Sequence, residues 1–251
     1  MLALTLLLTT IPVQETMAQE TVVAGLSRAA IEINTNFNGS EILIFGAVGR
    51  VSPPPEGAPL HVIITVEGPD QPVTVRRKER RFGIWMNIDA VEVDAAPTFY
   101  AVATTGPLNE VLTQTEDLRL QISVPRAIRA VGVNVGDTDN FTDALIRIRG
   151  DSDLYQMNEG SVTLRDATLF DTSFRLPANL VEGDYRTRIF LTRNGEVVGS
   201  FSHDIAVRKV GLERFIYNLA HDRPLLYGIL SLVIAIVAGW LASAVFRYIR
   251  P

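Results

Sequence analysis

A run of uncharged, mostly apolar residues near the C-terminus constrains this chain more than any other feature. It extends from Leu225 to Phe246 without one charged side chain. At 1.5 Å per residue, a helix of this length measures about 33 Å, which matches the hydrocarbon thickness of a bilayer. Pro224 suits the first turn of a helix, and Arg247 places positive charge beyond its other end. The sequence therefore predicts a transmembrane helix over residues 224–246 and a cytoplasmic tail of residues 247–251.

The N-terminal residues 1–18 follow the pattern of a signal peptide. An apolar stretch reaches Ile11, and Thr16 and Ala18 form the small-x-small motif that signal peptidase cleaves. We expect cleavage after Ala18. Together with the C-terminal helix, this predicts a single-pass type I protein with residues 19–223 outside the cytoplasm.

Charge and cysteine content exclude several kinds of protein. The chain has 251 residues, a formal net charge of -5 and no cysteine. An acidic chain lacks the basic surface with which a nucleic-acid-binding domain contacts phosphates. Without cysteine there is no disulfide, thiol nucleophile, iron–sulfur cluster or cysteine-ligated zinc.

Alternating apolar and polar residues are typical of β-strands, and they recur through the first half of the ectodomain. The runs cover residues 30–34, 41–45, 61–66, 72–76 and 99–103. Asn38-Gly39 and Gly68-Pro69-Asp70 supply turn residues at the short spacing of a β-sandwich. We therefore expect a sandwich domain over residues 19–122.

The second half, residues 123–210, also contains strand patterns. We expect a strand over 130–135, a helix over 141–149 and further strands from Ser161. Asn194-Gly195 joins two alternating runs as a tight hairpin turn, and Leu180 to Tyr185 matches the Leu-x-x-Gly-x-Tyr corner of Greek-key sandwiches. The predicted fold is mainly β, with two immunoglobulin-like sandwich domains followed by two helices.

The first of these helices is a juxtamembrane helix over residues 211–223. Apolar residues recur there at helical spacing, at Leu212, Phe215, Ile216 and Leu219. Such a stripe suits either the membrane surface or the face of the second sandwich. Both interpretations stay open at this point.

Several sequence blocks, in order along the chain, carry a resemblance to a known family. They are residues 38–46, 75–80, 83–87, 99–102, 176–179, 183–185, 208–211 and 219–228. From Val23 to Phe246 the chain resembles the alphaproteobacterial putative transmembrane protein family. The resemblance implies a Gram-negative envelope, with a periplasmic ectodomain and an inner-membrane anchor. It implies no activity and no catalytic residues, and its association with sulfite-exporter-type permeases makes a transporter one candidate partner.

Motifs for catalysis or metal binding are missing from the sequence. Asp137-Thr138-Asp139-Asn140 begins like a calcium loop, but Thr142 and Ile148 replace its glycine and glutamate. A helix N-cap explains these residues better. Neither Gly-x-Ser-x-Gly nor His-Glu-x-x-His occurs. We therefore expect no enzyme activity, no cofactor, no metal and no catalytic residue.

A cluster of positive charge is the sharpest feature of the ectodomain. It consists of Arg76, Arg77, Lys78, Arg80 and Arg81. In an acidic chain these residues form a candidate patch for an anionic partner. The alternative is a solvated hairpin or sheet edge, where cations discourage edge-to-edge pairing. Trp85, which follows the cluster, is expected in the core.

The apolar C-terminal helix carries small residues at every fourth position. Ser231, Ala235, Gly239 and Ser243 would lie on one face. Because helices in lipid associate by close backbone packing, this face is a candidate contact with a partner helix.

These features favour a non-catalytic, inner-membrane-anchored periplasmic binding or accessory subunit of a membrane protein complex. Its expected partners are the membrane and an integral membrane protein or a second copy, and nucleic acid is not expected. One alternative is an envelope hydrolase or ligand-binding receptor with a site between the two sandwiches. Another is a self-associating structural protein of the envelope. A sandwich fold by itself does not distinguish these functions.

Overall fold

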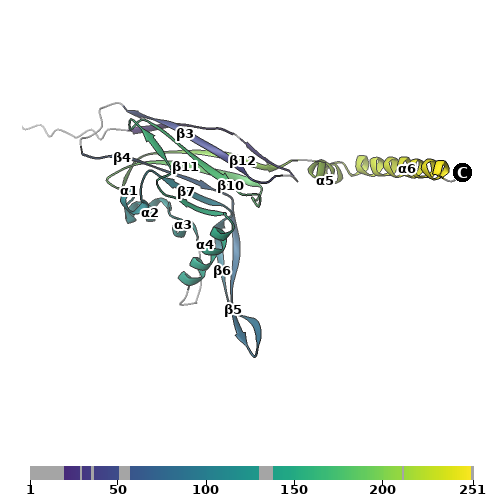
Figure 1. The fold of residues 1–251 in the computed structure, drawn as a ribbon, viewed down its shortest axis with the longest axis horizontal. Coiled ribbons are helices and arrows are strands. Elements are labelled where there is room, and N and C mark those ends of the chain that lie inside the picture. Colours follow the sequence, from purple (N-terminus) through teal and green to yellow (C-terminus); the bar gives the residue numbers. More distant parts are fainter. Residues whose placement is uncertain are drawn as a thin grey trace, which may run out of the picture.

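The computed structural model describes residues 20–28, 30–34, 37–50, 57–129, 138–210 and 212–249. The expected signal peptide, with its cleavage site after Ala18, and the expected strand 130–135 lie outside these residues. Two packed β-sheets dominate the described part, and two helices extend from one end of them (Figure 1).

The strands of each sheet come from distant parts of the chain. The four-stranded sheet has the order β1 (Glu20–Leu26), β3 (Ser40–Arg50), β10 (Leu169–Leu176) and β9 (Thr163–Arg165). The six-stranded sheet has the order β2 (Ala30–Ile33), β12 (Glu196–Lys209), β11 (Gly183–Arg193), β4 (Leu60–Glu67), β7 (Tyr100–Thr104) and β8 (Tyr155–Asn158). Most neighbours are antiparallel, whereas β2 runs parallel to β12 and β8 parallel to β7.

This pairing corrects the expected division into domains 19–122 and 123–210. Strand β3 pairs with β10, and β4 pairs with β11, so both sheets combine strands from the two expected domains. The described strands form one sandwich, without a boundary after residue 122. Alternation in a sequence shows which side of a strand is buried but not which distant strand it pairs with.

The main hydrophobic core lies between the two sheets. Ile42, Ile44 and Phe174 of the four-stranded sheet are buried in one cluster with Ile64 and Ile189 of the six-stranded sheet. These side chains alternate with exposed residues along β3 and β10, as expected for a sheet with one solvated face.

A second core covers the other face of the six-stranded sheet. Ile63, Tyr100 and Phe190 point to this side and pack with four helices. These helices are α1 (Leu108–Val111), α2 (Gln114–Leu120), α3 (Val124–Ala127) and α4 (Thr138–Asp151), grouped on one side of the sheet in Figure 1. Helix α4 confirms the expected helix over 141–149, but it begins at Thr138, so Asp139 and Asn140 lie in its first turn rather than before it.

The expected hairpin and tyrosine corner are both present. Strands β11 and β12 pair around Asn194 and Gly195, whose φ angles are 50° and 80°. The Tyr185 hydroxyl donates a 2.9 Å hydrogen bond to the Val181 carbonyl oxygen. This bond fixes the chain where it enters β11.

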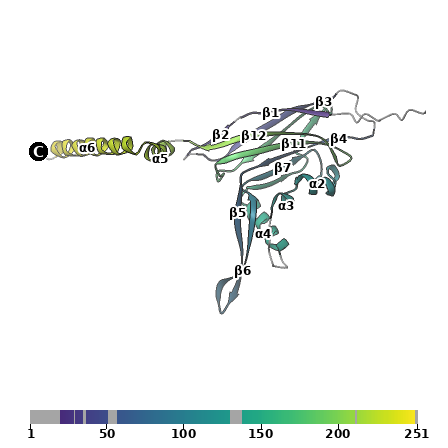
Figure 2. The same cartoon turned by 180° about the vertical axis from the view of Figure 1, so that it is seen from behind.

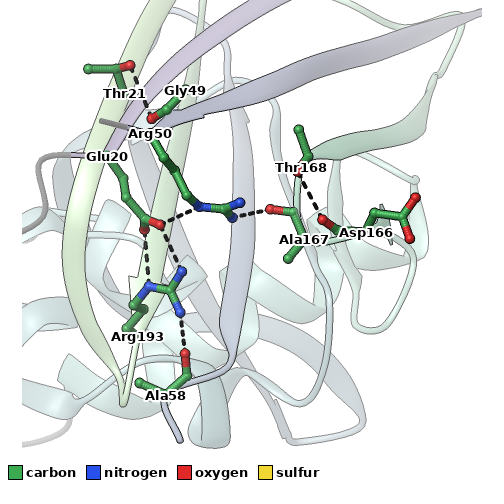
Figure 3. A network of polar contacts seen from close by, with 9 residues as sticks. All are labelled: Glu20, Thr21, Gly49, Arg50, Ala58, Asp166, Ala167, Thr168 and Arg193. Carbon is green, nitrogen blue, oxygen red and sulfur yellow. Dashed lines mark hydrogen bonds and ion pairs between the residues drawn. The ribbon is translucent and has the colours of Figure 1, made fainter. Parts of the chain in front are cut away.

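A buried ion-pair network closes one end of the sandwich (Figure 3). The Glu20 carboxylate accepts hydrogen bonds from Arg50 Nε at 2.8 Å and from Arg193 Nη2 at 2.8 Å. Both guanidinium groups also donate to backbone carbonyls, of Ala167 and Ala58 respectively. Burial alone would raise the pKa of the Glu20 carboxyl, but the two arginines outweigh it and hold this pKa below its usual range. The network joins β1, β3 and β11 and thus both sheets.

Helices α5 (Leu212–Asp222) and α6 (Pro224–Ile249) extend away from the end of the sandwich (Figures 1 and 2). Helix α6 contains an apolar span from Pro224 to Val245 that is long enough to cross a membrane, and none of this span is buried inside the chain. Helix α6 therefore has the length and composition of a membrane-spanning helix. Helix α5 contacts α6, and both views show it beyond the strands, so packing on a sandwich face is not supported.

Candidate functional site: a projecting β-hairpin

Strands β5 (Asp70–Arg81) and β6 (Ile84–Pro97) form a two-stranded sheet of their own, here called the arm. In both views the arm leaves the helical side of the sandwich and ends in solvent, pointing across the direction of α6 (Figures 1 and 2). At its root, Val75, Val91 and Val93 are buried in the second core. Because the root is packed, the sandwich holds the direction of the arm.

Apart from Arg77, which lies over the Phe141 ring of α4, the distal half of the arm, residues 76–87, projects into solvent. Every side chain from Arg76 to Asn87 is exposed. An isolated two-stranded ribbon is only marginally stable in water, because it has no second layer to cover its faces. The exposed ribbon is therefore a surface that a partner can stabilise.

The tip of the arm is apolar and conformationally unfavourable. Phe82 and Gly83 form the turn with φ angles of 52° and 85°. Two positive φ angles are typical of a type I′ turn, in which asparagine and glycine are preferred and a bulky residue is rare. The chain nevertheless places a fully exposed phenylalanine there.

Three more large apolar residues follow Phe82. Ile84 is 61% exposed, Trp85 69% and Met86 45%. The expectation that Trp85 lies in the core is therefore wrong, because the strand that carries it has left the sandwich. Together, Phe82, Ile84, Trp85 and Met86 are defined here as the apolar tip.

All five residues of the predicted cationic patch lie on β5 in the distal half of the arm. Arg77 pairs with Asp89 at 2.5 Å and lies over the Phe141 ring, 5.3 Å from its centroid. Arg81 pairs with Glu79 at 3.1 Å.

The remaining cations of the patch, Arg76, Lys78 and Arg80, are exposed and have no ion-pair partner among the described residues. The structure shows the solvated hairpin of the alternative interpretation. On this hairpin, cations without an ion-pair partner among the described residues lie next to the apolar tip.

The two faces of the distal arm differ in chemistry. Strand alternation places Arg76, Lys78 and Arg80 on one face, and Trp85 lies opposite Arg80 on the same face. The other face carries Ile84 opposite Arg81 and Met86 opposite Glu79. We call these the cationic face and the mixed face, since the second also carries the charged residues Arg77, Glu79 and Arg81.

A cavity of about 730 Å³ lies among helices α1 to α4. Its lining includes Asp117, Asp139, Asp143 and Glu159, with Arg126 as a counter-charge. The Asp117 carboxylate accepts two hydrogen bonds from Ser123, one from its backbone N–H and one from its hydroxyl, each 2.7 Å long. Asp117 therefore braces the α2–α3 connection rather than facing a ligand.

Metal ligands do not gather in the described part of the chain. No group of three or more histidine, aspartate and glutamate side chains there is placed to hold a metal ion. Asp137, the first residue of the calcium-like sequence, lies outside the described residues. The space between two sandwiches, expected for a hydrolase or receptor site, is not formed by the described strands because they build one sandwich.

The predicted helix-packing face lies on α6. Ser231, Ala235, Gly239 and Ser243 are all exposed, and a Cβ atom added at Gly239 would meet no atom within 4 Å. Ser231 donates hydrogen bonds to the Tyr227 and Gly228 carbonyls of its own helix. The face is thus smooth and unoccupied within the described chain.

The architecture of a β-sandwich joined to one apolar helix agrees with a comparison against family models. Residues 21–248 match the model of the family described as "Putative transmembrane protein" (Alph_Pro_TM). The chain belongs to this family. The matched range spans the arm, nearly all of the sandwich and most of α6. No curated protein matches the chain.

Proposed function

We propose that the protein is a non-catalytic, inner-membrane-anchored periplasmic binding subunit that holds an integral membrane protein through the tip of its arm. The observation that carries this proposal is the apolar tip, which the chain extends into solvent at the end of a ribbon whose side chains are all exposed from Arg76 to Asn87. Large apolar groups exposed together commonly mark an interaction site.

The direction of the arm supports a partner located beside the protein. With α6 crossing the membrane, the arm of Figures 1 and 2 points sideways rather than along α6. It therefore suits a protein standing next to it in the same membrane better than the bilayer surface that α6 enters.

The turn sequence supports the same proposal. Asparagine at position 82 would form the preferred Asn-Gly turn, so phenylalanine there costs turn stability. A residue that disfavours its own turn is readily explained if its side chain contacts a partner. The periplasmic orientation rests on the signal-peptide pattern of residues 1–18 and on the resemblance described above.

Affinity purification of the full-length protein from its native membrane, in mild detergent and with mass spectrometry, tests this proposal. We expect an integral membrane protein to accompany the wild type and to be lost from Phe82→Asn. This variant suits the turn, so the loss cannot be attributed to misfolding.

Leu118→Ser is the matched control, because Leu118 is 61% exposed on α2, away from the arm. It should retain the partner. If Phe82→Asn retains every protein that the wild type retains, the proposal is wrong.

A further inference from the structure

The outer face of the four-stranded sheet is apolar, and no other described part of the chain covers it. Its large apolar side chains, here called the apolar sheet face, are Val23, Leu43, Phe45 and Leu169, and each is exposed. Glycine and alanine residues between them leave a shallow hollow of about 730 Å³ with a mainly apolar lining. Large apolar groups exposed together commonly mark an interaction site.

Charges beside the apolar sheet face are balanced. Asp171, which lies opposite Phe45 in the ladder, pairs with Arg165 at 3.1 Å. Glu41 lies opposite Arg175 on the same sheet. An occupant of the hollow is therefore selected by its apolar groups, and a positively charged one meets no net positive charge there.

The apolar sheet face and the arm lie on opposite sides of the protein. The main core separates the four-stranded sheet from the six-stranded sheet, and the second core joins the far side of the six-stranded sheet to the helices and the root of the arm. Figures 1 and 2 accordingly show β3 on the side opposite the arm. One chain thus presents an apolar hollow on one side and an apolar tip on the other.

The hollow and the root of the arm also lie at about the same level along the sandwich. A Cβ atom at Gly199 of β12 would lie 2.7 Å from the Glu20 carbonyl oxygen of β1, so these two residues are level. Five residues further along both strands, toward α5, the ladders place Phe45 in one sheet and Glu67 in the other. The arm begins at Asp70, three residues after Glu67.

The membrane anchor allows two copies to meet through these surfaces. Copies in one bilayer keep the same direction of α6, so a shift in the membrane plane relates one to the next. Because the arm points across α6, a shift along the arm brings the tip of one copy to the apolar sheet face of its neighbour (Figures 1 and 2). A contact between two different surfaces needs no twofold axis, and it builds a row or a closed ring.

Net charge favours a second copy as the occupant. The distal half of the arm has five basic residues and one acidic residue, which gives +4. Because the whole chain carries -5, the remainder carries -9. Opposite net charges draw the arm of one copy toward the body of another.

The exposed apolar area is sufficient for a specific contact. With about 200 Å² for a large apolar side chain, the exposed fractions correspond to roughly 550 Å² on the apolar tip and roughly 400 Å² on the apolar sheet face. Together these areas approach about 1,000 Å², the size at which specific interfaces begin.

We propose that the arm of each copy binds a second copy of this chain, with Phe82 and Trp85 in the hollow beside Phe45 and Leu169. The inference rests on the proposed function, whose integral membrane partner it identifies as the chain itself. Each copy uses its tip on one neighbour and its sheet face on another, so the copies form a row or ring in the membrane plane.

Complementation between two variants tests the proposal, because the contact joins two different surfaces. Full-length chains with two different tags are co-expressed, solubilised in mild detergent and purified through one tag. Wild-type chains should recover each other. Phe82→Asn in both chains, or Val23→Lys in both, should lower this recovery roughly tenfold, as expected when a large apolar contact is removed from the centre of an interface.

The mixed pair gives the decisive result. With Phe82→Asn in one chain and Val23→Lys in the other, recovery should return, because the first chain keeps its sheet face and the second keeps its tip. Two misfolded variants could not restore each other. Leu118→Lys in both chains, the same kind of change on exposed α2, should behave as the wild type. Absence of recovery between wild-type chains, or in the mixed pair, would overturn the proposal.

Disulfide trapping in the intact membrane locates the contact, because the chain contains no cysteine. Trp85→Cys in one tagged chain and Leu169→Cys in the other should give a mixed disulfide after oxidation. The two positions lie on opposite sides of one chain, too far apart for a disulfide within it. Trp85→Cys in both chains should give at least tenfold less product, since two tips do not meet. Equal yields would contradict the head-to-tail contact.

Failure of this inference is distinguishable from failure of the proposed function. If Phe82→Asn loses a different membrane protein while tagged wild-type chains do not recover each other, only the second copy as occupant is refuted. If Phe82→Asn leaves the recovery of tagged chains and of every other protein unchanged, both proposals are wrong. Loss of recovery in Phe82→Asn with restoration in the mixed pair supports both.

Discussion

Replacing Glu20 by glutamine should destabilise the sandwich strongly while leaving its shape intact. The side chains of Glu20, Arg193 and Arg50 are 2%, 9% and 16% exposed, so the change leaves two nearly buried guanidinium groups without their counter-charge. Removing one partner of a buried ion pair costs about 3–5 kcal/mol. Because glutamine keeps one accepting oxygen, we expect about 3 kcal/mol, the lower end of that range.

The assay is thermal unfolding of the full-length protein in detergent, followed by circular dichroism of the strands. For a chain of this size the expected loss corresponds to about 6–12 °C in Tm. Glu41→Gln is the control, because Glu41 is an exposed strand residue of the same sheet. Equal Tm values for the two variants would refute the reasoning.

The effect of Glu20 should also depend on pH. Its pKa is lowered in the folded protein, so its contribution is complete above the pKa of the unfolded chain and is lost as pH falls through the folded value. The Tm difference between the wild type and Glu20→Gln should therefore shrink as the pH is lowered from 7 to about 3. A difference that stays constant over this range would show that the carboxylate charge does not stabilise the fold.

Three further substitutions test other parts of the structure. Tyr185→Phe should lower the unfolding free energy by about 1 kcal/mol in urea titrations, because the hydroxyl loses its bond to Val181; an unchanged value would argue against the corner. Gly46→Ala should lower Tm, since its Cβ would lie 2.5 Å from the Phe170 ring and 2.7 Å from the Val23 carbonyl oxygen, and a Tm equal to the wild type would show that both groups move aside without cost. Gly239→Leu should reduce recovery of any α6 partner by closing the smooth face, and undiminished co-purification would count against that face as a contact.

Local patterns were sufficient to predict several elements of this fold. The uncharged run indicated α6, Asn194-Gly195 indicated the β11–β12 hairpin, and the Leu-x-x-Gly-x-Tyr sequence indicated the corner at Tyr185. Each is encoded within a few neighbouring residues. The assignment to two sandwiches failed because it required pairing partners, such as β3 with β10, that lie more than 120 residues apart.

The arm was only half predicted. The cationic patch was evident from Arg76 to Arg81, but Trp85 was placed in the core by its residue type. No signal in the sequence opposed this placement, because Ile84, Met86 and Ile88 continue an apolar alternation toward Val91, whereas in the structure no position between Val75 and Val91 is buried. A long hairpin with no buried position between these valines must leave the protein surface.

The position of β12 determines how the sandwich responds to mechanical force from its anchor. This strand leads into α5 and α6, and it is hydrogen-bonded to β11 on one side and to β2 on the other. A pull transmitted along α6 therefore acts along β12, while its ladder hydrogen bonds lie across that direction. Many bonds on both sides then share the load in shear instead of opening one after another, so the ectodomain is attached to its membrane helix through a mechanically resistant strand.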